Sequence, residues 1–137
     1  MPHVCKALIV TCIDFRFQSA LVNFAKEQGL ENSYDLFSIA GTQKIFLDKE
    51  TQAIALKQVE LSQKLHGMTE VYLIAHWDCG AYGGSSAFAS AIKQKEQYIN
   101  DLVSAQKVIL EKFPNLTIHK YLANLADPGD ITFKKID

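Results

Sequence analysis

The chain has 137 residues, of which 48% are hydrophobic and 21% charged, and its formal net charge is −1. These values are typical of a globular protein, and they exclude a disordered chain, a collagen-like chain and a coiled coil. We expect one domain over residues 1–137, large enough to fold without a disulfide framework. Proteins that bind nucleic acid usually carry a basic excess, so nucleic acid is not expected as a partner.

No apolar run reaches the roughly 20 residues that a membrane-spanning helix needs. The first ten residues also lack the pattern of a signal peptide. We therefore expect a cytoplasmic protein with no membrane partner. The three cysteines, Cys5, Cys12 and Cys79, are odd in number, and without an export signal they favour thiol or metal chemistry over disulfides.

The first half of the chain alternates between apolar runs and helical patterns. Ala7–Thr11 is continuously apolar, which predicts a strand covered on both faces, as in a parallel sheet. Apolar residues then recur at i, i+3, i+4, i+7 and i+8 over residues 17–25, which predicts one face of a helix. Residues 34–40 predict a second such strand, and residues 48–65 are rich in helix formers up to Gly67.

The second half continues this alternation. Residues 71–75 predict a third strand, and a long helix is expected over residues 85–113, ending before Pro114. Residues 116–122 predict a fourth strand from a weaker apolar pattern. Residues 127–137 begin with the turn sequence DPGD and are expected to form an irregular tail.

Alternating strands and helices predict a doubly wound α/β fold, with a parallel-rich central sheet of about four strands flanked by helices. Ligands of such sheets bind beyond the carboxyl ends of the strands. This rule selects residues 11–16, 40–43 and 76–84, which contain two of the three cysteines and one of the four histidines. We expect the functional site in these segments.

Three residues of these segments suit zinc as ligands. Cys12 follows the first predicted strand, while His76 and Cys79 follow the third. If these strands are neighbours, two thiolates and an imidazole meet, and tetrahedral zinc keeps a fourth position for water or substrate. Each residue alone is more simply explained as a small buried side chain or a hydrogen-bonded core histidine. Together, at the ligand-binding edge, they favour a metal site.

Asp14 and Arg16 lie two residues apart beside the first of these ligands. A charge-assisted pair between them would keep the carboxylate ionised and able to accept a hydrogen bond near the metal. The alternative is a solvated surface ion pair that contributes little.

Gly80, Gly83 and Gly84 form a turn that leads from the third strand toward a helix. Its backbone N–H groups suit an anion such as bicarbonate, although a tight connection explains the glycines as well. Asp78 is either an acceptor near the metal or an exposed residue without a role.

The remaining histidines, His3, His66 and His119, have no partner at metal-ligand spacing and receive no function. His66 fits the last turn of the helix that ends at Gly67. Cys5 is expected to be a small buried residue.

The combination of C-x-D-x-R at residues 12–16 with H-x-x-C-G at residues 76–80 resembles the β class of carbonic anhydrases. The resemblance extends to the spacing of about 60 residues between the two motifs and to the pair Ala40-Gly41, and it covers residues 6–122. It implies a zinc enzyme that hydrates carbon dioxide reversibly to bicarbonate by attack of a zinc-bound hydroxide. It also implies a parallel sheet and a homodimer or higher homo-oligomer.

By position, the resemblance makes Cys12, His76 and Cys79 the zinc ligands and makes Asp14 with Arg16 the catalytic pair. Gly41 and Gly80 are expected to contact the small-molecule substrate.

Two other functions remain open. The family commonly has arginine and asparagine before the alanine–glycine pair, where this chain has Ser38 and Ile39. One is that the same zinc site hydrolyses another small electrophile, such as carbon disulfide or carbonyl sulfide. Alternatively, the protein is a non-catalytic relic of the fold that binds zinc or an anion.

Overall fold

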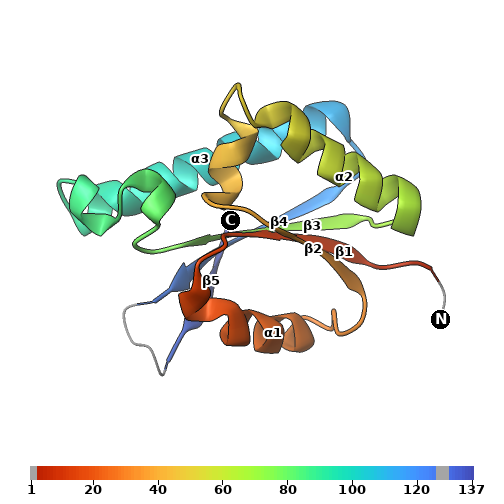
Figure 1. Ribbon diagram of the computed structural model, residues 1–137, viewed down its shortest axis with the longest axis horizontal. Helices are drawn as coiled ribbons and strands as arrows, with labels where there is room; N and C mark the ends of the chain where they lie inside the picture. Colours follow the sequence, from red (N-terminus) through yellow and green to blue (C-terminus); the bar gives the residue numbers. More distant parts are fainter. Residues whose placement is uncertain (1–2, 126–129) are drawn as a thin grey trace.

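A computed structural model describes residues 3–125 and 130–137, and these form a five-stranded sheet covered by helices on both faces (Figure 1). The sheet order is β2-β1-β3-β4-β5. The strands are β1 (Ala7–Thr11), β2 (Tyr34–Ser38), β3 (Glu70–His76), β4 (Thr117–Asn124) and β5 (Thr132–Ile136). The pairs β2–β1, β1–β3 and β3–β4 are parallel, whereas β4–β5 is antiparallel. The predicted parallel-rich α/β sheet is confirmed.

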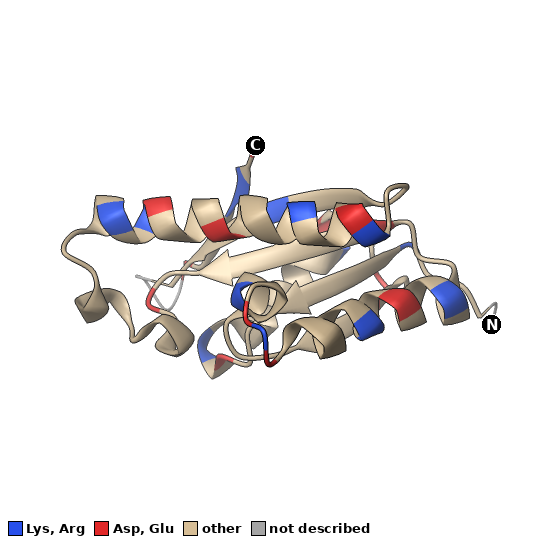
Figure 2. Ribbon diagram, turned by 90° about the horizontal axis from the view of Figure 1, so that it is seen from above, with Lys and Arg blue, Asp and Glu red and all other residues tan. Residues whose placement is uncertain are grey.

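Three α-helices cover this sheet: α1 (Gln18–Glu27) on one face, α2 (Gln52–His66) and α3 (Ala91–Lys112) on the other (Figure 1). The helix α2 ends where the sequence predicts, because Gly67 adopts φ = 65° and closes the last turn in the left-handed conformation. Lysines and acidic residues are interspersed along α2 and α3 (Figure 2), and pairs such as Lys93–Glu96 lie at 3.4 Å on their solvated faces.

The core lies on both sides of the central strands. Every residue of β1 is buried, as are the last six residues of β3. On one face Phe24 of α1 packs against Tyr121 of β4, with ring centroids 4.8 Å apart. On the other face Tyr98, Leu102 and Ile109 of α3 are fully buried. The continuous apolar runs of β1 and β3 therefore correspond to strands that are covered on both faces.

The same expectation is wrong for β2, whose residues are only partly buried. This strand forms one edge of the sheet, and its Leu36 is 52% exposed. The apolar pattern does not distinguish an edge strand from a central one.

The expected irregular tail is also wrong. Residues Thr132–Ile136 pair with β4 as the antiparallel strand β5, because Phe133 stacks on Phe24 at 4.5 Å and Ile136 is buried. Of the predicted turn sequence DPGD, residues 127–129 lie outside the described residues.

The long helix begins later than the predicted residue 85. Short 3-10 turns occupy residues 80–82 and 85–87, since Gly83 and Gly84 take φ values of 86° and 78°. The α-helix starts after Ser90, whose Oγ accepts a hydrogen bond from the Lys93 amide at 3.1 Å. In the described part of the chain, no helix is long and apolar enough to cross a membrane.

Candidate metal centre

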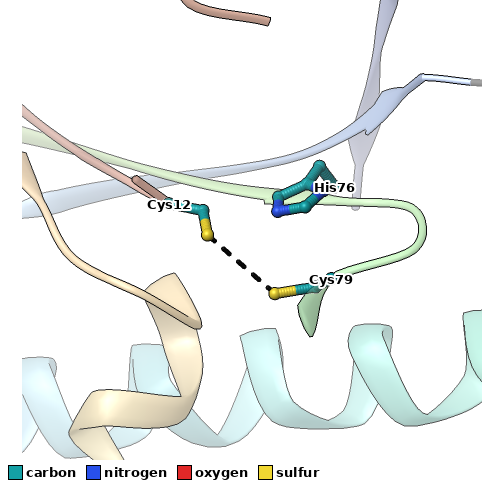
Figure 3. A group of neighbouring side chains, drawn as sticks. All are labelled: Cys12, His76 and Cys79. Atoms are coloured by element: carbon teal, nitrogen blue, oxygen red, sulfur yellow. Dashed lines mark hydrogen bonds between the residues drawn. The ribbon is translucent and has the colours of Figure 1, made fainter. Parts of the chain in front are cut away.

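The carboxyl ends of β1 and β3 bring Cys12, His76 and Cys79 together (Figure 3). Thr11 of β1 pairs with Ile74 of β3, so the residues that follow each strand meet at the same edge. The three side chains are buried, and their ligand atoms all lie within 4.8 Å of one another. The sequence placed these residues at this edge, and the structure shows that they converge.

The imidazole of His76 is oriented by its own loop. Its Nδ1 lies 2.7 Å from the carbonyl oxygen of Trp77, which only accepts, so Nδ1 carries the proton and Nε2 has the free lone pair. The Nε2 atom is buried and has no hydrogen-bond partner among the described residues. An unpaired buried polar atom costs about 1–3 kcal/mol. Coordination of a metal by Nε2 would remove that cost.

The two thiols face each other with their sulfurs 4.0 Å apart, and both cysteines are free. Two sulfurs bound to one tetrahedral zinc at about 2.3 Å lie roughly 3.8 Å apart, so this spacing fits a shared ion. The hydrogen bond between the thiols lowers the pKa of Cys12 and raises that of Cys79. Cys12, His76 and Cys79 therefore fit zinc in number, donor type and spacing.

The backbone holds this arrangement in place. The amide of Cys79 donates a hydrogen bond to the Tyr98 hydroxyl at 3.2 Å, which ties the loop to α3. Backbone N–H groups of Gly41 and Asp14 also favour the thiolate form of Cys12 and so contribute to its lowered pKa. Gly41 is buried with φ = 90°, and a Cβ there would lie 3.1 Å from the Cβ of Ala81.

The predicted pair of Asp14 and Arg16 is present beside the three candidate ligands. The Arg16 Nη2 lies 2.7 Å from Asp14 Oδ2, and its Nε lies 3.0 Å from Oδ1. These hydrogen bonds lower the pKa of the Asp14 carboxyl group. Because Asp14 Oδ2 is 3.9 Å from His76 Nε2, an ionised acceptor faces the position that a metal would occupy.

Asp78 is a second partner of the same guanidinium group. Its Oδ2 accepts from Arg16 Nη1 at 2.9 Å, and its carbonyl oxygen accepts from Nη2 at 3.0 Å. Its Oδ1 also accepts from the Ser85 amide at 2.8 Å. The sequence left open whether Asp78 is idle, and the structure shows that Arg16 bridges two carboxylates. The only sequence signal was the position of Asp78 between two candidate ligands.

Arg16 and Asp78 together line two cavities. One, of about 720 Å³, is lined by Arg16, Trp77 and Asp78 together with residues of α3. The other, of about 550 Å³, is lined by Asp14, Arg16 and Gly80. Of the two glycines expected to contact substrate, Gly80 lines a cavity, whereas Gly41 is buried and its backbone N–H faces the Cys12 thiol.

Solved structures that resemble this chain include β-carbonic anhydrases. The chain resembles the β-carbonic anhydrase isoform I of Trichomonas vaginalis with a TM-score of 0.62 and 19% identity, over 97% of this chain and 85% of the other. It also resembles a mutant of the β-carbonic anhydrase CafD of Aspergillus fumigatus, with a TM-score of 0.53, 11% identity and coverage of 97% and 90%. These similarities establish the fold.

The model of the family described as "Putative carbonic anhydrase" matches residues 3–127, and the chain belongs to this family. Its similarity to two uncharacterized rickettsial proteins spans 86% of the chain: 27% identity to one of Rickettsia bellii, covering 76% of that protein, and 29% identity to one of Rickettsia conorii, covering 67%. The resemblance noted in the two motifs is thus confirmed, as a divergent relative of the β class.

Proposed function

We propose that this protein is a zinc-dependent carbonic anhydrase that hydrates carbon dioxide reversibly to bicarbonate. The observation that supports it most is the buried Nε2 of His76, which has no hydrogen-bond partner among the described residues and lies within 4.8 Å of two free thiols. The chain also belongs to a family described as putative carbonic anhydrases, which supports the hydration of carbon dioxide as the reaction.

In this proposal, Cys12, His76 and Cys79 hold the zinc ion. Bound zinc lowers the pKa of a coordinated water toward about 7, which supplies a nucleophile near neutral pH. The hydrogen bond from Nδ1 to the Trp77 carbonyl leaves the Nε2 lone pair of His76 available and would orient the imidazole as a zinc ligand.

The carboxylate of Asp14 orients the reactants. Because the hydrogen bonds from Arg16 lower the pKa of this group, Asp14 would be ionised and would only accept hydrogen bonds, so it could hold the proton of a reacting hydroxyl group. Asp78 accepts a hydrogen bond from the other end of the guanidinium group and so fixes Arg16 in place. Through Arg16, Asp78 therefore also helps to position Asp14.

The test is stopped-flow hydration of carbon dioxide with protein of measured zinc content. We expect activity in the natural protein and loss of both zinc and activity in Cys79→Ser. The variant Arg16→Gln should keep its zinc and lose about 10- to 100-fold in kcat/KM, because it removes a group that positions Asp14. A zinc-loaded natural protein with no activity above the zinc-free background would contradict the proposal and favour a non-catalytic binding protein or another small electrophile as substrate.

We also propose that the protein acts as a homodimer with the candidate centre near the contact between copies. Ile13 and Phe15, on either side of Asp14, are 62% and 86% exposed. Two large apolar side chains beside a candidate site are unusual on a surface that faces only water. Leu36, on the edge strand β2, is a further exposed apolar side chain.

A further inference from the structure

A second group of metal-ligating side chains lies at the opposite, amino-terminal edge of the parallel strands. It consists of Cys5, which precedes β1, Asp35 of β2 and His66, the last residue of α2. Their ligand atoms lie within 4.8 Å of one another, as do those of Cys12, His76 and Cys79. The five residues of β1, roughly 16 Å of strand, separate the two groups.

The contacts within this group are short and directed at one place. The Nδ1 of His66 lies 2.9 and 2.8 Å from the two carboxylate oxygens of Asp35. The hydroxyl of Ser62, one turn earlier on α2, donates to Asp35 Oδ2 at 2.7 Å. Although burial raises the pKa of Asp35, the hydrogen bonds from Ser62 and His66 prevail and lower it, so the carboxylate is ionised.

The backbone brings the thiol to this pair. The amide of Cys5 donates to the carbonyl of His66 at 3.0 Å, and the amide of Lys6 donates to the carbonyl of Ser33 at 3.0 Å. Gly67 ends α2 directly after His66, so the helix terminus faces the segment before β1. The three side chains are therefore held together by the fold itself.

The second nitrogen of His66 also has a partner. Its Nε2 lies 3.3 Å from Nε2 of His3. If Nδ1 binds a metal, the imidazole proton is on Nε2 and can be donated to His3. Ligand histidines commonly make such an orienting hydrogen bond.

The donor types define the cation. A thiolate, an imidazole and a carboxylate together suit zinc and related divalent transition metals, whereas calcium and magnesium select oxygen ligands. Three protein ligands leave one position of a tetrahedral ion for water. We propose that Cys5, Asp35 and His66 form a second transition-metal site that takes zinc and fastens the amino-terminal segment to β2 and α2.

The neighbouring pair of His119 and Glu70 provides a matched control. The imidazole of His119 on β4 lies 2.8 Å from the carboxylate of Glu70 on β3, and both side chains are partly exposed, as in the pair of His66 and Asp35. No cysteine belongs to this pair, and in the described part of the chain no third His, Cys, Asp or Glu places a ligand atom within 4.8 Å of both partners.

The composition makes a direct test possible, since the chain has three cysteines. In Cys12→Ser/Cys79→Ser, Cys5 is the sole thiol, so any cobalt–thiolate charge-transfer absorption must arise from Cys5. We expect this absorption to saturate at about one Co²⁺ per chain and Zn²⁺ to abolish it by displacement. Adding Asp35→Asn or His66→Ala should remove it, whereas adding His119→Ala should leave it unchanged.

Absence of the band at excess Co²⁺ in the folded double variant would overturn the proposal. A band that survives both Asp35→Asn and His66→Ala would also overturn it, because the thiol alone would then bind the metal. Circular dichroism of each metal-free variant verifies folding. If the double variant does not fold, zinc is counted in the natural protein and in Cys5→Ser: a decrease of about one ion per chain supports the site, and equal counts overturn it. Activity has no part in these measurements, so the outcome is independent of the proposed reaction.

Discussion

The imidazole of His76 has two nitrogens in different surroundings. One is hydrogen-bonded to the Trp77 carbonyl, and the other is buried without a partner among the described residues. The sequence predicts the position of His76 at the end of a strand, but the tautomer depends on a backbone carbonyl of the following loop. The hydrogen bond from Arg16 to Asp78 could not be predicted from the sequence either. It depends on the conformation of the same loop, in which Asp78 has φ = 59°.

Gly41 provides a prediction at the scale of one residue. Gly41→Ala should lower the free energy of unfolding by about 1–3 kcal/mol, because φ is 90° and the new Cβ would meet Ala81 Cβ at 3.1 Å and Lys44 Cβ at 3.3 Å. Denaturant unfolding measures this loss.

Gly29 is the matched control for that substitution. It also has a positive φ, 73°, but nothing lies within 4 Å of its ideal Cβ. Gly29→Ala therefore reports backbone strain alone, about 1–2 kcal/mol. If the two variants lose equal stability, the crowding at Ala81 contributes nothing and the argument for Gly41 is wrong.

At the scale of elements, the sequence predicted β1 and β3 well because each has two buried faces and so an apolar run without interruption. The strand β5 was missed, since its exposed Lys134 and Lys135 conceal the packing of Phe133 and Ile136. Pairing with β4 stabilises it, and that contact lies outside the local pattern. Local periodicity thus predicts central strands better than edge strands.

The contact between β3 and β4 leads to a prediction about pH. Burial raises the pKa of Glu70, but the hydrogen bond from His119 and the charge of Lys6 prevail and lower it. A carboxylate whose pKa is lower in the folded state stabilises the protein above its unfolded pKa, about 4.3, and this stabilisation is lost as pH falls through the folded value.

We therefore expect Glu70→Gln to lower the free energy of unfolding near pH 7 by about 1 kcal/mol. The difference from the natural protein should shrink as the pH falls below about 4.3, where the natural carboxylate becomes protonated. Chemical unfolding at a series of pH values measures both curves. Curves that stay parallel through the acid range would show that Glu70 gains nothing from His119 and Lys6.

At the scale of the whole molecule, the sheet separates two groups of possible ligands. The group at the carboxyl edge could be predicted, because the strand ends of parallel sheets are the known ligand-binding positions. The group at the amino edge could not, since Cys5, Asp35 and His66 come from three segments with no shared motif. The prediction that His66 lies in the last turn of its helix is confirmed. Cys5 was expected to be buried, but it is only partly buried. Only the three-dimensional positions of these segments reveal the second group.

The proposed association of two copies is a prediction about the whole surface. If Phe15 and Leu36 lie in the contact, light scattering should give twice the mass of one chain for the natural protein. Phe15→Glu and Leu36→Lys should each shift the equilibrium toward single chains, because a charge buried in an apolar contact without a partner costs several kcal/mol. Ile92 is 71% exposed on α3, which covers the face of the sheet opposite α1 (Figure 1). Ile92→Lys should therefore leave the mass unchanged.

A natural protein that stays at the mass of one chain over a wide concentration range would contradict the dimer, and equal dissociation by Ile92→Lys would place the contact on another face.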